Sequence, residues 1–274
     1  METKIKYIYF DLDGTILDRN KTLRFNLVEK IFKIRNQYNI KFGIATGRHY
    51  LMVKYVAAKI LPELPTITNN GASISYSDFK HIDIAKIAPT DVSKLTSYLQ
   101  SLQCDFFIFS SQRLYSNNLK NWRIKQLNEA AVKNNLGTLM WKYFPLDQEL
   151  ISRDGVLKFL VCTAEKNPIV KNYVKKNLPN LECLTSESDI LDIFCKSVDK
   201  YFSIQYVIEK LDADMDEVLY FGDSENDYMC LKEIKNSVYV GRTSCELASV
   251  ATYITDPADQ DGVLKFLNEH FPDR

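Results

Sequence analysis

Two aspartates stand two positions apart at the end of a hydrophobic stretch near the N-terminus. Asp11 and Asp13 follow the run Ile5–Phe10, and Gly14 and Thr15 come directly after them. If the run is a strand, both carboxylates lie at one edge of its sheet, where they could bind a metal ion or take part in proton transfer. The alternative is a solvated turn, in which Asp and Gly are also common.

Neighbouring residues exclude two other kinds of ligand-binding loop. An EF-hand calcium loop starting at Asp11 would need glycine at its sixth position and glutamate at its twelfth, where this chain has Ile16 and Thr22. The sequence contains no Gly-x-x-x-x-Gly-Lys segment, so a Walker loop is excluded. The six cysteines and three histidines are scattered without zinc-site spacing. Any metal is therefore expected to be held by oxygen.

Other polar turns occupy the same kind of position, each at the end of a short apolar run. The runs and their turns are Ile40–Ala45 before Thr46-Gly47-Arg48, Pro65–Thr68 before Asn69-Asn70-Gly71, Val218–Phe221 before Gly222-Asp223, Val238–Val240 before Gly241, and Thr252–Ile254 before Thr255-Asp256. Helical spacing is found in Phe25–Tyr38, Tyr50–Leu61, Lys200–Leu211 and Asn226–Ile234. This alternation predicts an α/β fold with a parallel sheet. Because ligands bind beyond the carboxyl ends of such strands, the distant turns should converge.

The middle of the chain has a different pattern, with alternating strands mixed among helices. The expected strands are Asp105–Ser110, Arg113–Asn117, Val156–Thr163 and Glu182–Thr185, and the expected helices are Asp91–Leu102, Leu119–Asn134 and Asn167–Lys176. The pattern predicts an α+β module inserted into the α/β domain. The predicted boundaries are residues 1–81 and 190–274 for the core and 82–189 for the insertion.

Four motifs, in this order, resemble those of the haloacid dehalogenase superfamily. They are Asp11-Leu12-Asp13-Gly14-Thr15, Thr46 within Ala45-Thr46-Gly47-Arg48, Lys200, and Gly222-Asp223-Ser224-Glu225-Asn226-Asp227. Asn70-Gly71-Ala72 and Asp261-Gly262-Val263 resemble the pattern of its Cof-type (subclass IIB) sugar-phosphate phosphatases. The resemblance covers nearly the whole chain. It implies a Rossmann-like parallel-sheet core with an inserted cap domain.

The resemblance also implies a role for each carboxylate. Asp11 would attack phosphorus and form an aspartyl-phosphate, which divides hydrolysis into two steps. Asp13 would protonate the leaving oxygen and then take a proton from the attacking water. Mg²⁺ would be bound by Asp11, the backbone carbonyl of Asp13 and Asp223. Asp227 would have a supporting role, orienting Lys200 or the water molecules on the metal.

The phosphate group would be bound by residues from several of these turns, namely Leu12, Thr46, Gly47, Lys200 and Asn226. Lys200 would supply positive charge to the phosphate and to the crowded carboxylates. Its surroundings, Ser197-Val198-Asp199-Lys200-Tyr201, depart from the Gly-Val-Ser-Lys-Gly pattern of the subgroup, and nearby Lys196 is a competitor. Lys200 is preferred because it opens an expected helix.

The function predicted from these features is hydrolysis of a small phosphorylated metabolite, such as a sugar phosphate, in the cytoplasm. A phosphomutase and a regulatory protein that binds phospholigands without turnover are the alternatives. Lys+Arg and Asp+Glu balance at 35 each, so neither nucleic acid nor a membrane is an expected partner. The sequence does not fix the oligomeric state, although a monomer is favoured. Candidate specificity residues in the cap are Trp122, Arg123, Lys125, Trp141 and Lys158.

Overall fold

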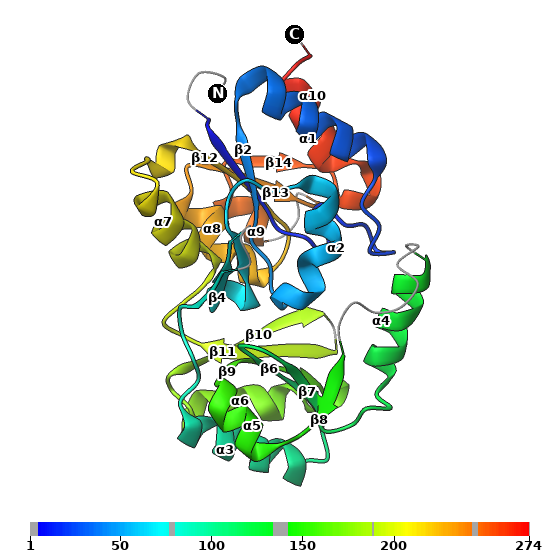
Figure 1. Ribbon diagram of the computed structural model, residues 1–274, viewed down its shortest axis with the longest axis vertical. Helices are drawn as coiled ribbons and strands as arrows, with labels where there is room; N and C mark the ends of the chain where they lie inside the picture. Colours follow the sequence, from blue (N-terminus) through cyan, green and yellow to red (C-terminus); the bar gives the residue numbers. More distant parts are fainter. Residues whose placement is uncertain (1–4, 77–79, 134–141, 188, 243–245, 274) are drawn as a thin grey trace. The chain divides into compact units, whose positions relative to one another are not determined.

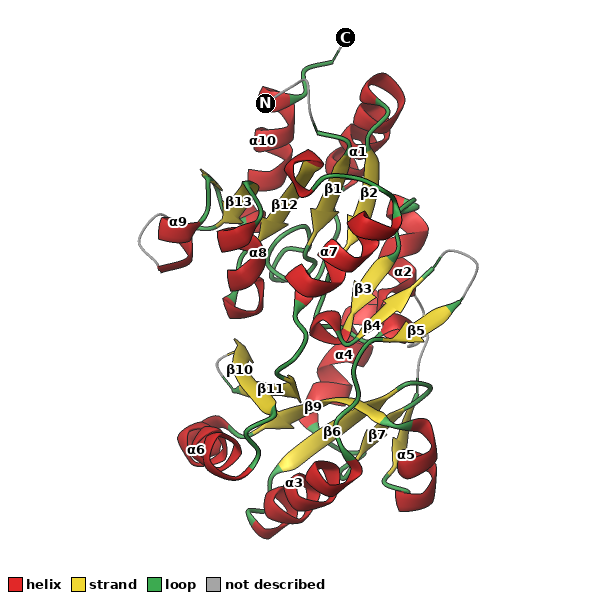
Figure 2. Cartoon of the chain, turned by 90° about the vertical axis from the view of Figure 1, so that its left-hand side faces the viewer, coloured by secondary structure: helices red, strands yellow, loops and turns green. Residues whose placement is uncertain are grey.

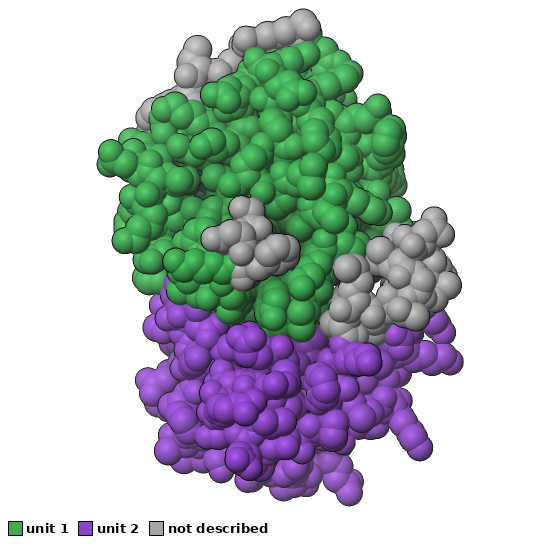
Figure 3. Space-filling model, viewed as in Figure 1, with its two compact units in different colours: residues 1–82, 199–274 green, residues 83–198 purple. Residues whose placement is uncertain are grey.

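The structure, a computed structural model, describes residues 5–76, 80–133, 142–187, 189–242 and 246–273. The chain divides into two compact units, which Figure 3 shows in different colours. Unit 1 comprises Met1–Ile82 and Asp199–Arg274, and unit 2 comprises Asp83–Val198. The elements of each unit can be followed by label and colour in Figure 1. None of the helices in the described ranges is long and apolar enough to cross a membrane.

In the described part of unit 1, five parallel strands form the main sheet, in the order β14-β13-β12-β1-β2. Their bounds are Tyr7–Phe10 for β1, Lys41–Ile44 for β2, Val218–Gly222 for β12, Asn236–Val240 for β13 and Tyr253–Thr255 for β14. The two central strands, β1 and β12, are almost entirely buried, as expected for a parallel sheet covered on both faces. The predicted α/β class is confirmed.

The two faces of this sheet carry different side chains. On one face the ring of Phe10 lies 5.2 Å from that of Phe221, which in turn contacts the ring of Phe266 in a helix. On the opposite face Tyr220 donates its hydroxyl hydrogen to Asp227. The helices of unit 1 are α1 (Phe25–Tyr38), α2 (Tyr50–Ile60), α7 (Lys200–Lys210), α8 (Tyr228–Glu233), α9 (Glu246–Val250) and α10 (Gly262–His270). Helix α1 packs against α10, and α7 packs against α8.

The connections between strands locate the crevice of the sheet. From β1 the chain continues to the neighbouring strand β2, whereas from β12 it continues in the other direction, to β13 and β14. The strand order therefore reverses between β1 and β12. In open parallel sheets the crevice at such a reversal, beyond the carboxyl ends of the strands, is where ligands bind.

A small second sheet, which belongs to unit 1 except for the last residue of β5, consists of β3 (Thr66–Thr68), β4 (Ser73–Ser75) and β5 (His81–Asp83). The sequence predicts a parallel strand that ends at Thr68. In the structure β3 pairs antiparallel with β4, and its residue Ile67 forms an isolated parallel bridge with Ala45, the residue after β2. The turn after β3 is the short 3₁₀ helix Asn69–Gly71, and it lies beside α7.

Unit 2 is built on a six-stranded sheet with the order β10-β11-β9-β6-β7-β8. The strands are β6 (Asp105–Ser110), β7 (Leu114–Ser116), β8 (Tyr143–Pro145), β9 (Val156–Cys162), β10 (Leu181–Glu187) and β11 (Ile190–Cys195). All neighbouring pairs are antiparallel except β7 and β8. The helices are α3 (Pro89–Ser101), α4 (Trp122–Lys133), α5 (Gln148–Asp154) and α6 (Asn167–Asn177), of which α3 and α6 lie along the sheet (Figure 2).

Two sequence-based bounds in this region need correction. A domain boundary at residue 190 would assign β11 to the core, but β11 pairs antiparallel with both β9 and β10, so unit 2 extends to Val198. The helix expected from Leu119 starts instead at Trp122. Asn118 and Asn121 delay the start, because their side-chain oxygens accept hydrogen bonds from the amides two residues ahead and stabilise a turn.

Candidate active site

Asp11 lies at the carboxyl end of β1, at the crevice between β1 and β12. Its amide donates to the carbonyl of Phe221 in β12, at 2.9 Å, and its side chain is buried. The chain then turns tightly, and the carbonyl of Leu12 accepts hydrogen bonds from the amides of Thr15, Ile16 and Leu17. These hydrogen bonds fix the backbone on both sides of Asp11, and with it the orientation of the Asp11 side chain.

Gly14 is required in this turn for two reasons. It adopts a φ of +87°, which residues with a Cβ rarely adopt. A Cβ added to Gly14 would lie 2.2 Å from Oδ2 of Asp223. The hydroxyl of Thr15 donates to the other oxygen of Asp223, at 2.8 Å. Gly14 and Thr15 therefore allow the turn after Asp13 to lie directly against the side chain of Asp223.

Lys200 joins the carboxylates at this crevice. The helix α7 begins at Lys200 because the carboxylate of Asp199 caps it, accepting from the amide of Phe202 at 2.7 Å. The ammonium group of Lys200 lies 2.7 Å from Asp11 Oδ1 and 2.7 Å from Asp227 Oδ1. Asp11, Asp223 and Asp227 each offer one oxygen within 4.8 Å of the others. We call these three carboxylates the acidic cluster.

The pKa values in this region follow from burial and charge. Burial raises the pKa of Asp11 to about 7, although the positive charge of Lys200 opposes the shift. Burial also raises the pKa of Asp223 well above its ordinary value, and the charge of Asp11 adds to the rise. Burial alone would lower the pKa of Lys200, but the carboxylates of Asp11 and Asp227 raise it above its ordinary value. Lys200 is therefore protonated. Its single positive charge does not offset the burial of the carboxylates, because the pKa values of Asp11 and Asp223 stay raised.

Asp227 is fixed through both of its carboxylate oxygens. Oδ1 accepts hydrogen bonds from Lys200 and, at 2.5 Å, from the hydroxyl of Tyr220. Oδ2 accepts from the backbone amides of Asp223 and Ser224, at 2.9 and 3.0 Å. Asp227 thus ties the strand β12 to the start of α7. The role expected of Asp227, orienting Lys200 or the water molecules on the metal, stays a prediction.

The Asp13 carboxylate has cationic partners of its own, although its charge adds to the rise in the pKa of Asp11. Arg48 holds both of its oxygens, with Nε at 2.7 Å and Nη2 at 2.6 Å, and Lys21 lies at 2.8 Å. Burial favours a raised pKa for Asp13, but Arg48 and Lys21 together hold it well below the usual range. A carboxylate with these partners is ionised at neutral pH.

Thr46 and Gly47 lie in the loop after β2, the strand next to β1. The carbonyl of Phe10 accepts a hydrogen bond from the amide of Ala45, which sets the loop beside the end of β1. The Thr46 hydroxyl accepts from the amide of Arg48 at 3.2 Å. The same short loop therefore carries Thr46 and the guanidinium that holds Asp13.

Asn226 lies beside the acidic cluster, and its side chain has contacts other than the expected one. Its side-chain oxygen accepts from Lys200 at 3.2 Å and from the Ser224 hydroxyl at 2.8 Å. Its side-chain nitrogen, which was expected to donate to phosphate, donates to Asn70 Oδ1 at 3.0 Å. Asn70 is therefore the present partner of the expected phosphate donor.

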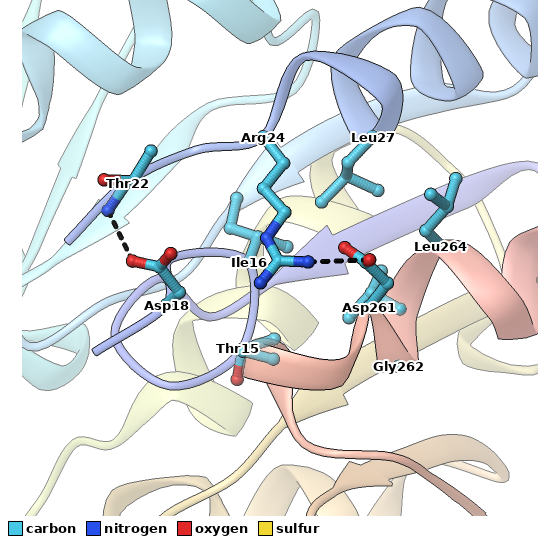
Figure 4. Close-up of a pocket in the computed structure, with 11 residues that line it drawn as sticks. Thr15, Ile16, Asp18, Thr22, Arg24, Leu27, Asp261, Gly262 and Leu264 are labelled. Atoms are coloured by element: carbon cyan, nitrogen blue, oxygen red, sulfur yellow. Dashed lines mark hydrogen bonds and ion pairs between the residues drawn. The ribbon is translucent and has the colours of Figure 1, made fainter. Parts of the chain in front are cut away.

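The loop that follows the first motif is braced against helix α10. Figure 4 shows the small hollow between them, with Thr15 at one end and Arg24 directed towards Asp261. Arg24 Nη1 lies 2.6 Å from Asp261 Oδ2, and Arg24 Nη2 donates to the carbonyl of Asp259. Asp18 stabilises the loop from within by accepting from the amide of Thr22. These contacts set the path of the chain that leaves Thr15.

Among the lysines near the start of α7, only Lys200 reaches the cluster, since Lys196 is exposed. The cap candidates do not gather at one place. Trp122 and Lys125 are exposed on α4, whereas Lys158 is buried in β9 and pairs with Asp192 at 3.0 Å. Trp141 lies outside the described residues.

Sequence reasoning assigned no role to Arg48, Lys21 or Tyr220. Arg48 is part of a quoted motif, and its position two residues after Thr46 was the available signal. Lys21 and Tyr220 carry no such signal, because one is a loop lysine and the other alternates with apolar residues in a strand.

Comparison with known proteins identifies the family of this chain. A relative, a 5-amino-6-(5-phospho-D-ribitylamino)uracil phosphatase of Bacillus subtilis, is 26% identical over 264 residues, which is 96% of this chain and 95% of the relative. The crystal structure of a haloacid dehalogenase-like hydrolase from Bacteroides thetaiotaomicron matches with a TM-score of 0.83 at 21% identity, covering 98% of this chain and 100% of that one.

A second solved structure, of a subclass IIB sugar phosphatase, matches with a TM-score of 0.79 at 21% identity, covering 98% of this chain and 100% of that one. These likenesses confirm the expected fold. The family profile described as haloacid dehalogenase-like hydrolase matches residues 8–267, a range that contains the acidic cluster, Lys200 and Thr46. The chain therefore belongs to the haloacid dehalogenase-like hydrolase family.

Proposed function

We propose that this protein is a Mg²⁺-dependent phosphatase that hydrolyses small phosphorylated metabolites of the sugar-phosphate class through an aspartyl-phosphate at Asp11. One observation carries the proposal: the buried Asp11 carboxylate, at a strand end, is held by Lys200 and lies within 4.8 Å of two further carboxylates. Family membership supports hydrolysis as the reaction class.

The charges of the acidic cluster fit a divalent cation. When all three of its carboxylates are ionised, as metal ligands must be, they exceed the single ammonium group of Lys200 by two negative charges. All the side chains in the cluster offer oxygen, the ligand that Mg²⁺ prefers. Asp11, the backbone carbonyl of Asp13 and Asp223 would hold the ion, because both oxygens of Asp227 already accept hydrogen bonds. The bound ion would neutralise charge on the cluster and on the phosphate.

Asp11 would be the nucleophile. Attack by its carboxylate on phosphorus forms an acyl phosphate and releases the alcohol, and water then releases inorganic phosphate. The carboxylate must be ionised for the first step, and Lys200 favours the ionised form because its ammonium group lies 2.7 Å from Oδ1. Lys200 would also contact the phosphate oxygens as negative charge is transferred.

Asp13 would act on the protons of the two steps. Its pairing with Arg48 and Lys21 favours the ionised form, which is the form that accepts a proton from the attacking water. Protonating the leaving group requires that a proton first reach Asp13, so one of the two cations must move away before that step. The side chain of Asp13 is 33% exposed, which allows such an exchange.

The remaining phosphate contacts would come from backbone and side-chain donors around the crevice. The Thr46 hydroxyl and the Gly47 amide lie on the loop beside the end of β1. The backbone of Leu12 belongs to the turn between the two aspartates. Asn226 would have to exchange its contact with Asn70 in order to donate to phosphate.

The substrate class is supported by the relatives. The Bacillus subtilis relative is named for a substrate whose phosphate is carried by a ribityl chain, which is derived from a sugar. A substrate of this kind offers a phosphomonoester joined to several hydroxyl groups. We extend the class, and not that one compound, to this protein.

A phosphate-release screen tests the proposed function. Purified protein with Mg²⁺ would be offered sugar phosphates, sugar-alcohol phosphates, nucleotides, pyridoxal phosphate and flavin-pathway phosphates. We expect release of inorganic phosphate, fastest from monophosphates of sugars or sugar alcohols. Transfer of phosphate between positions of a sugar without net release would indicate a phosphomutase instead. Binding of these compounds without any turnover would contradict an enzymatic function and indicate a binding protein.

A further inference from the structure

Two buried tyrosines lie directly opposite each other on the central strands of unit 1. Tyr9 of β1 and Tyr220 of β12 are register partners, and neither ring is exposed to solvent. Their hydroxyl groups have different acceptors. Tyr9 donates to the backbone carbonyl of Pro65 at 3.2 Å, whereas Tyr220 donates to the carboxylate of Asp227 at 2.5 Å. The second bond is the stronger kind, because its acceptor is charged.

The bond from Tyr220 reaches the proposed nucleophile through only two further groups. Asp227 Oδ1, which accepts from Tyr220, also accepts from Lys200, and the same ammonium group donates to Asp11. An ammonium group has three hydrogens to donate. In Lys200 they have three acceptors, on Asp11, Asp227 and Asn226. The position of the ammonium group is therefore a balance between the pull of Asp11 and that of Asp227.

We propose that Tyr220 is a positioning residue that sets this balance by sharing Oδ1 of Asp227 with Lys200. The hydroxyl group of Tyr220 supplies part of the positive potential that stabilises the buried carboxylate of Asp227. The ammonium group of Lys200 is therefore attracted less strongly to Asp227 and stays close to Asp11. The proposal rests on the proposed function, in which Lys200 must contact both Asp11 and the phosphate. Tyr220 itself touches neither of them.

Removal of the hydroxyl group has a definite consequence in this arrangement. In a Tyr220→Phe variant, Lys200 becomes the only side-chain donor to Oδ1 of Asp227 among the bonds described. The ammonium group then shifts towards Asp227 and away from Asp11. Displacement of a positioning group by a fraction of an ångström to an ångström costs about 10- to 100-fold in rate. We therefore expect kcat to fall about 10-fold or more.

Tyr9→Phe provides the matched control. It removes the same atom from a tyrosine that is equally buried, at the opposite position of the neighbouring strand, with an acceptor outside the acidic cluster. Both variants lose one buried hydrogen bond, so both are expected to lower the thermal midpoint. Only Tyr220→Phe should lower kcat, with KM changed by less than about twofold because the ring remains in place.

A double-mutant cycle with Asp227→Asn shows whether Tyr220 acts through Asp227. If it does, Tyr220→Phe will cause little further loss of kcat when Asp227 is already replaced, so the two effects will not add. This comparison is made at a temperature at which all four proteins are folded, as judged by circular dichroism.

The outcomes separate the two proposals. A wild-type protein that hydrolyses none of the phosphomonoesters would contradict the proposed function, and the role of Tyr220 with it. If the wild type is active, the role of Tyr220 alone is overturned by either of two results: Tyr220→Phe keeps its kcat within twofold of that of Tyr9→Phe, or the losses in the double-mutant cycle are additive.

Discussion

An Asp11→Asn variant is expected to fold and to lose at least about 10³-fold of the phosphatase activity, the scale of nucleophile deletions in other enzymes. The amide has the shape of the carboxylate and can still accept a hydrogen bond from Lys200, which lies 2.7 Å away in the wild type. The asparagine amide, unlike the carboxylate, is not a nucleophile for phosphorus under the conditions of the assay. The measurement is release of inorganic phosphate from the best substrate of the screen.

The same variant should be at least as stable as the wild type when metal is absent. Burial raises the pKa of Asp11 to about 7, so the ionised carboxylate is less favourable in the folded chain than in the unfolded one. The resulting loss of stability begins as the pH rises above about 4, the unfolded pKa, and is complete above about 7. Asparagine removes this cost. A thermal midpoint above that of the metal-free wild type at pH 8 is therefore expected.

Asp256→Asn is the control for this pair of measurements. Asp256 also belongs to unit 1, but it is about half exposed and pairs with Lys265. Neutralising it should change neither activity nor the thermal midpoint by much, because exposed ion pairs contribute little. If Asp11→Asn keeps more than a tenth of the wild-type activity, Asp11 is not the nucleophile.

Removal of divalent metal is expected to abolish turnover, and Mg²⁺ should restore it. Without the ion, Lys200 is the one ammonium group that contacts the acidic cluster among the ion pairs described, so the ionised Asp11 that attack requires is disfavoured by burial and by its carboxylate neighbours. A phosphate dianion would add to the repulsion. Activity is measured after dialysis against EDTA and then after addition of Mg²⁺. Full activity in the chelator would contradict the proposed metal site.

Thermal stability gives a second view of the metal that does not depend on turnover. A ligand that binds the folded chain alone stabilises it by about 2.7 kcal/mol when present at 100 times its dissociation constant. Mg²⁺ should therefore raise the thermal midpoint of the wild type. The increase should be much smaller for Asp223→Asn, in which one of the proposed ligands loses its charge.

The sequence was sufficient to predict the core of the fold because its signals are local. Each polar turn follows an apolar run, and parallel strands bring such turns to one edge of a sheet, so Asp11, Thr46 and Asp223 could be expected to converge. Lys200 follows no such run, and it was expected there only from the resemblance. The structure places Lys200 between two of the carboxylates and leaves Lys196 exposed.

Features that depend on pairing between distant segments were not predictable. The apolar strand β11 could have joined either sheet on composition alone, and only its pairing with β9 and β10 assigns it to unit 2. Tyr220 resembles any buried strand residue until the carboxylate of Asp227 is found 2.5 Å from its hydroxyl group. The amide of Asn226 was assigned to phosphate from the resemblance, and its contact with Asn70, 156 positions away, could not be foreseen because it has no local signal.

The central claim, a covalent intermediate on Asp11, can be tested by trapping it. Borohydride reduces an aspartyl-phosphate to homoserine, and peptide mass spectrometry locates the change. Wild-type protein quenched during a single turnover should contain homoserine at position 11, and samples without substrate or with Asp11→Asn should not. Phosphate release with Asp11 unmodified at every time point, or with the modification at another aspartate, would contradict the claim.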